Sequence, residues 1–110
     1  MPYDEKLADR IRKLIPIGKT YSEKRMFGGL AFLLDGHMQI AASGKGGILV
    51  RVHPDKSEEF VIDKNVEIAI MRGKEMKGWL RVTEENLSTK AKLKKWFDLS
   101  LSYVESLPPK

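Results

Sequence analysis

The sequence contains no cysteine among its 110 residues. This absence excludes disulfide bonds, thiolate nucleophiles and cysteine-based metal sites, and it is compatible with a reducing compartment. Long hydrophobic runs are also missing, because no stretch approaches the roughly 18 consecutive apolar residues of a membrane-spanning helix. Residues 1–14 carry charges early and lack the apolar core of a secretory signal. We therefore expect a cytoplasmic protein without a membrane association.

The charge balance is basic, with 20 Lys and Arg against 15 Asp and Glu, which gives a net charge of +5. Hydrophobic residues make up 42% and charged residues 32%, a balance that favours a folded chain over a disordered one. No repeat, low-complexity tract or linker interrupts the sequence, so we expect residues 1–110 to form a single domain. The positive charge permits contact with nucleic acid or an acidic protein, but it also suits a surface that serves only solubility.

Hydrophobic periodicity predicts the element order α-β-β-β-α-β-β-α. Helical spacing of apolar residues predicts a first helix over residues 4–15 and a final helix from residue 88 or 89 to about 107. Asp35-Gly36 is typical of a two-residue hairpin turn. Strands are predicted at 30–34, 37–42, 48–52, 66–71 and 78–82, with a short helix at 56–61. We therefore expect an α+β fold with an antiparallel sheet of about five strands packed against the N- and C-terminal helices. The face of the sheet without helices would need a partner or polar alternation.

The glycine and histidine patterns favour structural roles. Gly28-Gly29 precedes a strand, whereas phosphate-binding glycine turns follow a strand and open a helix, so we predict a bend or bulge there. The glycines of residues 43–47 lack P-loop spacing and indicate a hairpin loop. The only histidines, His37 and His53, have no metal-binding spacing, and we expect both at the surface or rim. No nucleophile elbow or suitably placed carboxylate pair is present, so we expect no catalytic residue, metal or cofactor. A weaker alternative is a ligand-binding or enzymatic cleft beside Gly28-Gly29 and His37.

Two basic clusters are candidates for interaction. Residues 74–82 place Met76 and Trp79 beside Lys77, a combination found in interface hot spots, although Trp79 would equally suit the core. Four lysines crowd the start of the final helix. They are either a solvated helix end or a contact for nucleic-acid phosphates, which would give salt-dependent binding. We call Lys90, Lys92, Lys94 and Lys95 the lysine collar.

The segments KRMFGGLAFLLDGHM and MKGWLRV together resemble the TfoX/Sxy N-terminal domain family. The resemblance implies an α+β domain with a helix-flanked antiparallel sheet, related in shape to secretion-chaperone-like folds. It also implies kinship with bacterial competence regulators, which carry a second, C-terminal helical domain and act with a transcription factor to turn on DNA-uptake genes. The family brings no catalytic residues to carry over. We therefore expect a non-enzymatic module that binds a protein partner in transcriptional regulation, with nucleic-acid binding as the alternative. A homodimer through an exposed sheet face or edge would also suit this fold. The candidate interaction residues are Lys24, Arg25, Met26, Phe27, Met76, Lys77 and Trp79.

Overall fold

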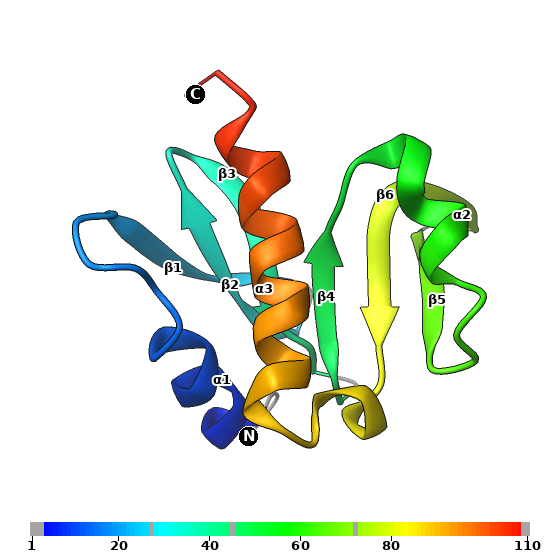
Figure 1. The fold of residues 1–110 in the computed structure, drawn as a ribbon, viewed down its shortest axis with the longest axis horizontal. Coiled ribbons are helices and arrows are strands. Elements are labelled where there is room, and N and C mark those ends of the chain that lie inside the picture. Colours follow the sequence, from blue (N-terminus) through cyan, green and yellow to red (C-terminus); the bar gives the residue numbers. More distant parts are fainter. Residues whose placement is uncertain (1–3, 27, 45, 72, 109–110) are drawn as a thin grey trace.

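The structure is a computed structural model that describes residues 4–26, 28–44, 46–71 and 73–108. Three α-helices and six strands make up its main elements, with short 3-10 turns η1 and η2 between them (Figure 1). Along the chain these are α1 (Glu5–Arg12), β1 (Tyr21–Met26), β2 (Gly29–Leu34), β3 (His37–Ala42), β4 (Ile48–Arg51), η1 (Pro54–Lys56), α2 (Ser57–Phe60), β5 (Val66–Met71), β6 (Lys74–Val82), η2 (Glu84–Leu87) and α3 (Lys90–Glu105).

The strands form one sheet in the order β1-β2-β3-β4-β6-β5, and every neighbouring pair is antiparallel. The connection through η1 and α2 carries the chain past β6, so β5 becomes the edge strand next to β6. The α+β prediction with its antiparallel sheet is confirmed, but the sheet has six strands among the described residues rather than five. The additional strand is β1, whose residues 22–25 are polar and exposed, as an edge strand tolerates.

Local signals explain where the helices and the first hairpin begin. The Asp4 side chain accepts hydrogen bonds from the backbone nitrogens of Lys6 and Leu7 and so caps α1. Thr89 caps α3 in the same manner, accepting from the backbone nitrogen of Lys92. The turn between β2 and β3 has positive φ at Asp35 (53°) and Gly36 (85°), which confirms the predicted two-residue hairpin.

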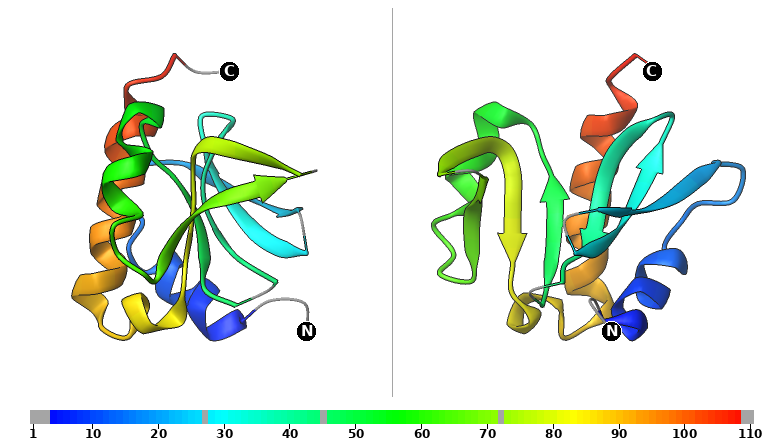
Figure 2. Two further views of the ribbon diagram at one scale, coloured as in Figure 1. Left: turned by 90° about the vertical axis from the view of Figure 1, so that its right-hand side faces the viewer. Right: turned by 180° about the vertical axis from the view of Figure 1, so that it is seen from behind.

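The main hydrophobic core lies between the helices and one face of the sheet, which we call the helix face. Phe32, Ile40, Val50 and Leu80 project from successive strands at 0% exposure, and they share this core with residues of all three α-helices. Burying a side chain of this size stabilises the fold by about 1.5–3 kcal/mol. Figure 2 shows α3 running along this face of the sheet, with the other face turned away from it.

A buried polar network joins β1, β3 and α3 within this core. A register shift in β2–β3 leaves Gln39 without a strand partner and turns its side chain toward the helix face. Its Nε2 donates to the carbonyl of Phe97 (3.2 Å) and to Ser100 Oγ (3.0 Å), and its Oε1 accepts from the Tyr21 hydroxyl. These hydrogen bonds satisfy a side chain that is fully buried, so the bulge and α3 are fixed together.

An ion pair ties the edge strand β1 to α1. The Arg12 guanidinium donates from Nε and Nη2 to the two Glu23 carboxylate oxygens, at 2.8 and 2.7 Å. This hydrogen bonding holds the pKa of Glu23 below its usual range. Because both side chains are about 40% exposed, the pair contributes at most about 1 kcal/mol and mainly positions β1.

Candidate functional site

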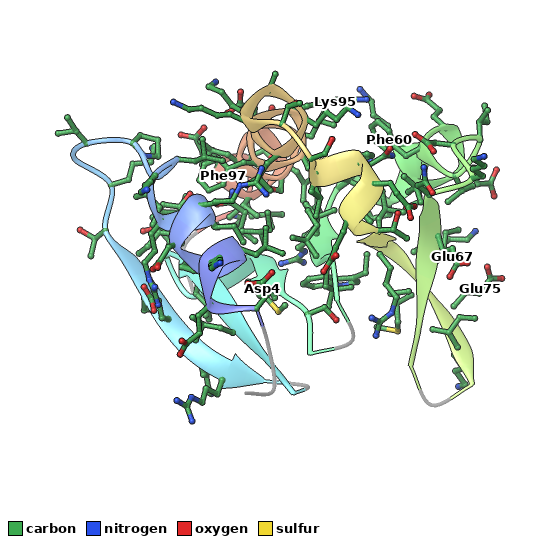
Figure 3. All side chains as sticks on the ribbon, turned by 90° about the horizontal axis from the view of Figure 1, so that it is seen from below. Asp4, Phe60, Glu67, Glu75, Lys95 and Phe97 are labelled. Carbon is green, nitrogen blue, oxygen red and sulfur yellow. The ribbon has the colours of Figure 1, made fainter. Side chains whose placement is uncertain are left out.

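The side of the sheet opposite the helix face carries no helix among the described residues, and we call it the open face. The cross-strand register assigns its side chains, because directly opposed residues share a face. Figure 3, seen from below, shows Phe97 on the α3 side of the molecule and Glu67 on the β5–β6 hairpin at the far end of the sheet. The open face consists of Ser22 and Lys24 (β1), Ala31 and Leu33 (β2), Met38 and Ala41 (β3), Leu49 and Arg51 (β4), Trp79 and Arg81 (β6), and Glu67 and Ala69 (β5).

The centre of the open face is a second, smaller apolar cluster. Ala31, Ala41, Leu49 and Ala69 are at most 4% exposed, although no described helix covers them. Leu33, Met38 and Trp79 pack on this cluster and are themselves half-buried. These four residues are therefore shielded from water by longer side chains of the same face, which leave apolar surface available to a partner.

Arg51 is the most distinctive charged residue of the open face. Its guanidinium carbon lies 5.2 Å from the centroid of the Trp79 ring and 5.5 Å from that of Tyr103 on α3. Among the described residues it makes no ion pair and no side-chain hydrogen bond, so the two rings are its partners. Cation–π contacts occupy the flat faces of a guanidinium and leave its N–H edge able to donate to a carboxylate.

A second arginine accompanies this group. Arg81 lies opposite Leu49 and Glu67 in the register, and its Nη1 donates to Ser43 Oγ at 3.3 Å. With Lys24, the open face carries three cations against one acid, Glu67, a surplus of 3 − 1 = 2 positive charges. The arrangement can attract and orient an acidic group beside an apolar surface.

A bend in β6 sets the position of Trp79. Four residues of β6, 76–79, lie opposite the single residue 69 of β5, and Gly78 has a φ of 89°. The backbone nitrogen of Gly78 donates to Ser57 Oγ (2.7 Å), and its carbonyl accepts from the nitrogen of Val52 (2.7 Å). A Cβ at Gly78 would meet the Val52 carbonyl oxygen at 3.1 Å, so glycine suits both the angle and the close approach.

Gly28-Gly29 forms a bend at the start of β2, as the sequence predicts. Gly28 has a φ of 76°, and a Cβ at Gly29 would lie only 2.2 Å from the carbonyl oxygen of Ala42 on β3. Gly29 therefore permits two strands to approach closely, and the segment after it is a strand rather than a helix. Gly29 begins β2 while His37 pairs with Leu34 at its other end, about 16 Å away along the strand, and the alternative of a ligand-binding or enzymatic cleft beside the glycines stays a prediction.

One histidine prediction needs correction. His37 is 7% exposed rather than at the surface, and its Nε2 lies 2.6 Å from the carbonyl oxygen of Pro108, beyond α3. It is buried because it begins β3 on the helix face, opposite Leu34. His53 is exposed, as predicted. No cluster of three or more potential metal ligands is present in the part of the chain that the structure describes.

The predicted interaction residues fall into two groups that the structure does not bring together. Lys24 and Arg25 lie on β1, whereas Met76, Lys77 and Trp79 lie on β6, with three strands between them. Lys24 belongs to the open face with Trp79, but Arg25 pairs with Leu30 of the helix face. Met76 and Lys77 are exposed beside the bend of β6. Phe27 and the side chain of Met26 lie outside the described residues.

The lysine collar surrounds the start of α3, and most of its members have local partners. Lys94 pairs with Asp98 at 2.7 Å, and Lys95 Nζ lies 5.1 Å from the centroid of the Trp96 ring. Lys92 Nζ donates to Ser88 Oγ, whereas Lys90 has no partner among the described residues. The collar is thus a partly paired helix end, and its contact with nucleic acid remains a prediction.

Sequence reasoning missed Arg51, the most distinctive charged residue of the open face. Arg51 sits in the apolar run ILVRV, and its two aromatic partners come from β6 and α3. Period-two alternation gives a partial signal, since Trp79 and Arg81 alternate with the core residues Leu80 and Val82.

The fold and the open face define an α+β module with a helix-covered antiparallel sheet and an uncovered basic, aromatic face. A family model for the TfoX N-terminal domain matches residues 13–103, and the chain belongs to this family. A search of curated proteins gives no match. No helix among the described residues is long and apolar enough to cross a membrane.

Proposed function

We propose that this chain is a non-enzymatic TfoX-type module that binds a protein partner through the open face, in the regulation of transcription or competence. The family membership supports the regulatory setting. The carrying observation is Arg51, whose guanidinium lies against two aromatic rings and has no acceptor among the described residues.

The chemistry of the open face specifies the partner surface. Trp79, Met38 and Leu33 are half-buried and offer apolar contacts above the buried cluster of the open face. Trp and Arg are among the residues most enriched at binding hot spots. The cations Arg51 and Arg81 would pair with Asp or Glu side chains of the partner. The occupant is therefore a protein segment that presents an acidic group beside apolar side chains.

The test begins with co-purification of the tagged protein from its native host, followed by reconstitution with the purified partner. We expect Arg51→Glu to weaken binding by about tenfold or more, because it replaces the pairing cation by a repelling acid. Binding of the wild type should also weaken with salt, and charge reversal of acidic residues in the partner should reproduce the loss.

Lys24 and Arg25 provide a matched pair of control positions. Both are exposed residues of β1, but only Lys24 belongs to the open face. Lys24→Glu should weaken binding, whereas Arg25→Glu should leave it unchanged. Equal binding by Arg51→Glu and wild type, or equal effects at Lys24 and Arg25, would count against the open face as the binding surface.

A further inference from the structure

A groove on the helix side of the sheet lies between the η1–α2 segment and the C-terminal half of α3. Its volume is about 270 Å³. In Figure 1 these two segments stand on either side of the end of β4. Its walls come from two segments that are distant in sequence, residues 52–60 and residues 99–106. The lining residues are Val52, His53, Lys56 and Phe60 from the first segment, and Leu99, Ser102, Tyr103 and Ser106 from the second.

One part of the groove is apolar and well fixed. Val52 belongs to the main core, and Phe60 and Leu99 pack against that core while remaining partly exposed. The Phe60 ring meets Trp96 edge-on, with centroids 5.5 Å apart. A ligand in this groove would therefore contact a preformed hydrophobic wall, as most small-molecule sites provide.

The remaining lining residues are hydrogen-bond donors. The backbone nitrogen of Asp55 donates to His53 Nδ1 at 3.1 Å, so the neutral ring carries its proton on Nε2. Lys56 has no ion pair, and the Tyr103 hydroxyl no hydrogen bond, within the described residues. Ser102 adds a further hydroxyl.

No carboxylate lines the groove. Four acids adjoin lining residues in sequence, and all four have exposed side chains that water screens; they are Asp55, Glu59, Asp98 and Glu105. The groove therefore offers one full positive charge, on Lys56, with neutral donors around it. That charge balances one negative charge, which favours a monoanion over a dianion such as a phosphate monoester.

We propose that this groove binds a small organic acid, with one carboxylate at Lys56 and His53 and an apolar body against Phe60, Leu99 and Val52. The groove shares Tyr103 with the open face, where that ring contacts Arg51, but the proposed ligand contacts at Lys56, His53 and Phe60 are not part of the open face. The ligand class follows from the volume, the single cation and the mixed polar and apolar lining.

Sodium benzoate, benzyl alcohol and phenyl phosphate are probes of similar shape and different charge. Titration into the ¹⁵N-labelled full chain should give saturable amide shifts for residues 52–60 and 99–106 with benzoate. Benzyl alcohol should bind about tenfold more weakly, because the charge-assisted contact to Lys56 is lost. Absence of saturation with benzoate, equal binding of benzyl alcohol, or tighter binding of phenyl phosphate would each overturn the proposal.

Substitution at Lys56 separates recognition of the anion from general surface charge. Lys56→Gln should weaken benzoate by about tenfold, whereas Lys13→Gln, at an exposed lysine beyond α1, should leave it unchanged. The spectra of both variants report folding directly, since an intact fold retains the dispersion of the wild type. Equal losses of benzoate affinity in the two variants would show that only the net charge of the protein matters, and would overturn the assignment of Lys56 as the carboxylate contact.

Discussion

The two faces of the sheet are formed by the same strands but are shielded from water in different ways. The helix face buries large side chains such as Phe32 and Leu80 under three helices. On the open face, a buried cluster of three alanines and Leu49 is shielded by Leu33, Met38 and Trp79. The longer apolar side chains keep the residues beneath them from water without a covering helix, while their own apolar surface stays near the exterior. Under the proposed function, stability and recognition fall on different faces of one sheet.

The largest expected effect comes from neighbouring residues of β2 that face opposite ways. Phe32→Ala should lower the free energy of unfolding by about 3–5 kcal/mol, because Phe32 is fully buried and the cavity cannot collapse completely. Leu33→Ala should cost about 1 kcal/mol, since Leu33 is only partly buried on the open face.

Urea unfolding followed by circular dichroism measures both changes. Similar losses at the two positions would show that the open face contributes to stability as the helix face does. That result would break the proposed division between the faces.

The second prediction concerns the glycine that holds the β2–β3 register. Gly29→Ala should cost about 3 kcal/mol or more, because its Cβ would lie 2.2 Å from the backbone oxygen of Ala42. Gly28→Ala should cost about 1–2 kcal/mol from its positive φ alone, because nothing lies within 4 Å of its Cβ.

The relative stability losses of Gly29→Ala and Gly28→Ala also test what keeps each β2 side chain on its own face of the sheet. A one-residue slip of β2 would exchange its helix-face and open-face side chains. Thermal unfolding of the two variants tests the order, and a larger loss at Gly28 would refute the close-approach argument at Gly29.

The third prediction sharpens the role of the polar network on the helix face. Burial raises the pKa of Tyr21 to about 12, the Glu105 charge adds to the rise, and the hydrogen bond to Gln39 opposes it. The folded state therefore holds this proton more tightly than the unfolded chain, whose tyrosine pKa is about 10. The resulting stability is complete below about pH 10 and is lost between about pH 10 and 12.

Tyr21→Phe should remove that part of the alkaline loss and cost about 1 kcal/mol at neutral pH, where Gln39 Oε1 loses its donor. Tyr103→Phe is the matched control, because no hydrogen bond holds its hydroxyl within the described chain. Unfolding free energies measured from neutral to alkaline pH decide the question. An unchanged alkaline loss in Tyr21→Phe would contradict the network.

Much of this fold follows from local sequence signals. Helical periodicity identifies α1 and α3, and Asp35-Gly36 identifies the β2–β3 hairpin. The sequence pattern does not predict β1, because YSEKRM has apolar residues only at its ends. It predicts β6 from residue 78, whereas the strand starts four residues earlier, within the charged stretch KEMK. Both are segments whose strand geometry depends on pairing with a neighbour rather than on their own pattern.

The candidate site was less predictable than the fold. Trp79 stands out by its type and its basic neighbours, and the structure places it on the open face. Arg51 acquires its significance only through Trp79 and Tyr103, which lie 28 and 52 residues further along the chain. No local sequence pattern predicts the contact of Arg51 with these two rings, because it depends on the bend at Gly78 and on the packing of α3.

The smallest expected effect on stability lies outside both faces, in the lysine collar. Replacing Lys90, Lys92, Lys94 and Lys95 by Gln should change the free energy of unfolding by no more than about 0.5–1 kcal/mol, because these side chains are exposed and Lys94–Asp98 is a surface pair. Binding of the protein partner at the open face should be unchanged.

The nucleic-acid alternative instead predicts that the wild type binds DNA or RNA at low salt, with affinity that falls steeply as salt rises. It also predicts that the variant with all four lysines replaced loses this binding. Fluorescence anisotropy with labelled oligonucleotides distinguishes the two, with Arg51→Glu as the control that retains the collar. If the lysine-collar variant loses nucleic-acid binding and Arg51→Glu retains it, α3 carries a second interaction surface. If the wild type binds no nucleic acid at low salt, the open face is left as the proposed recognition surface.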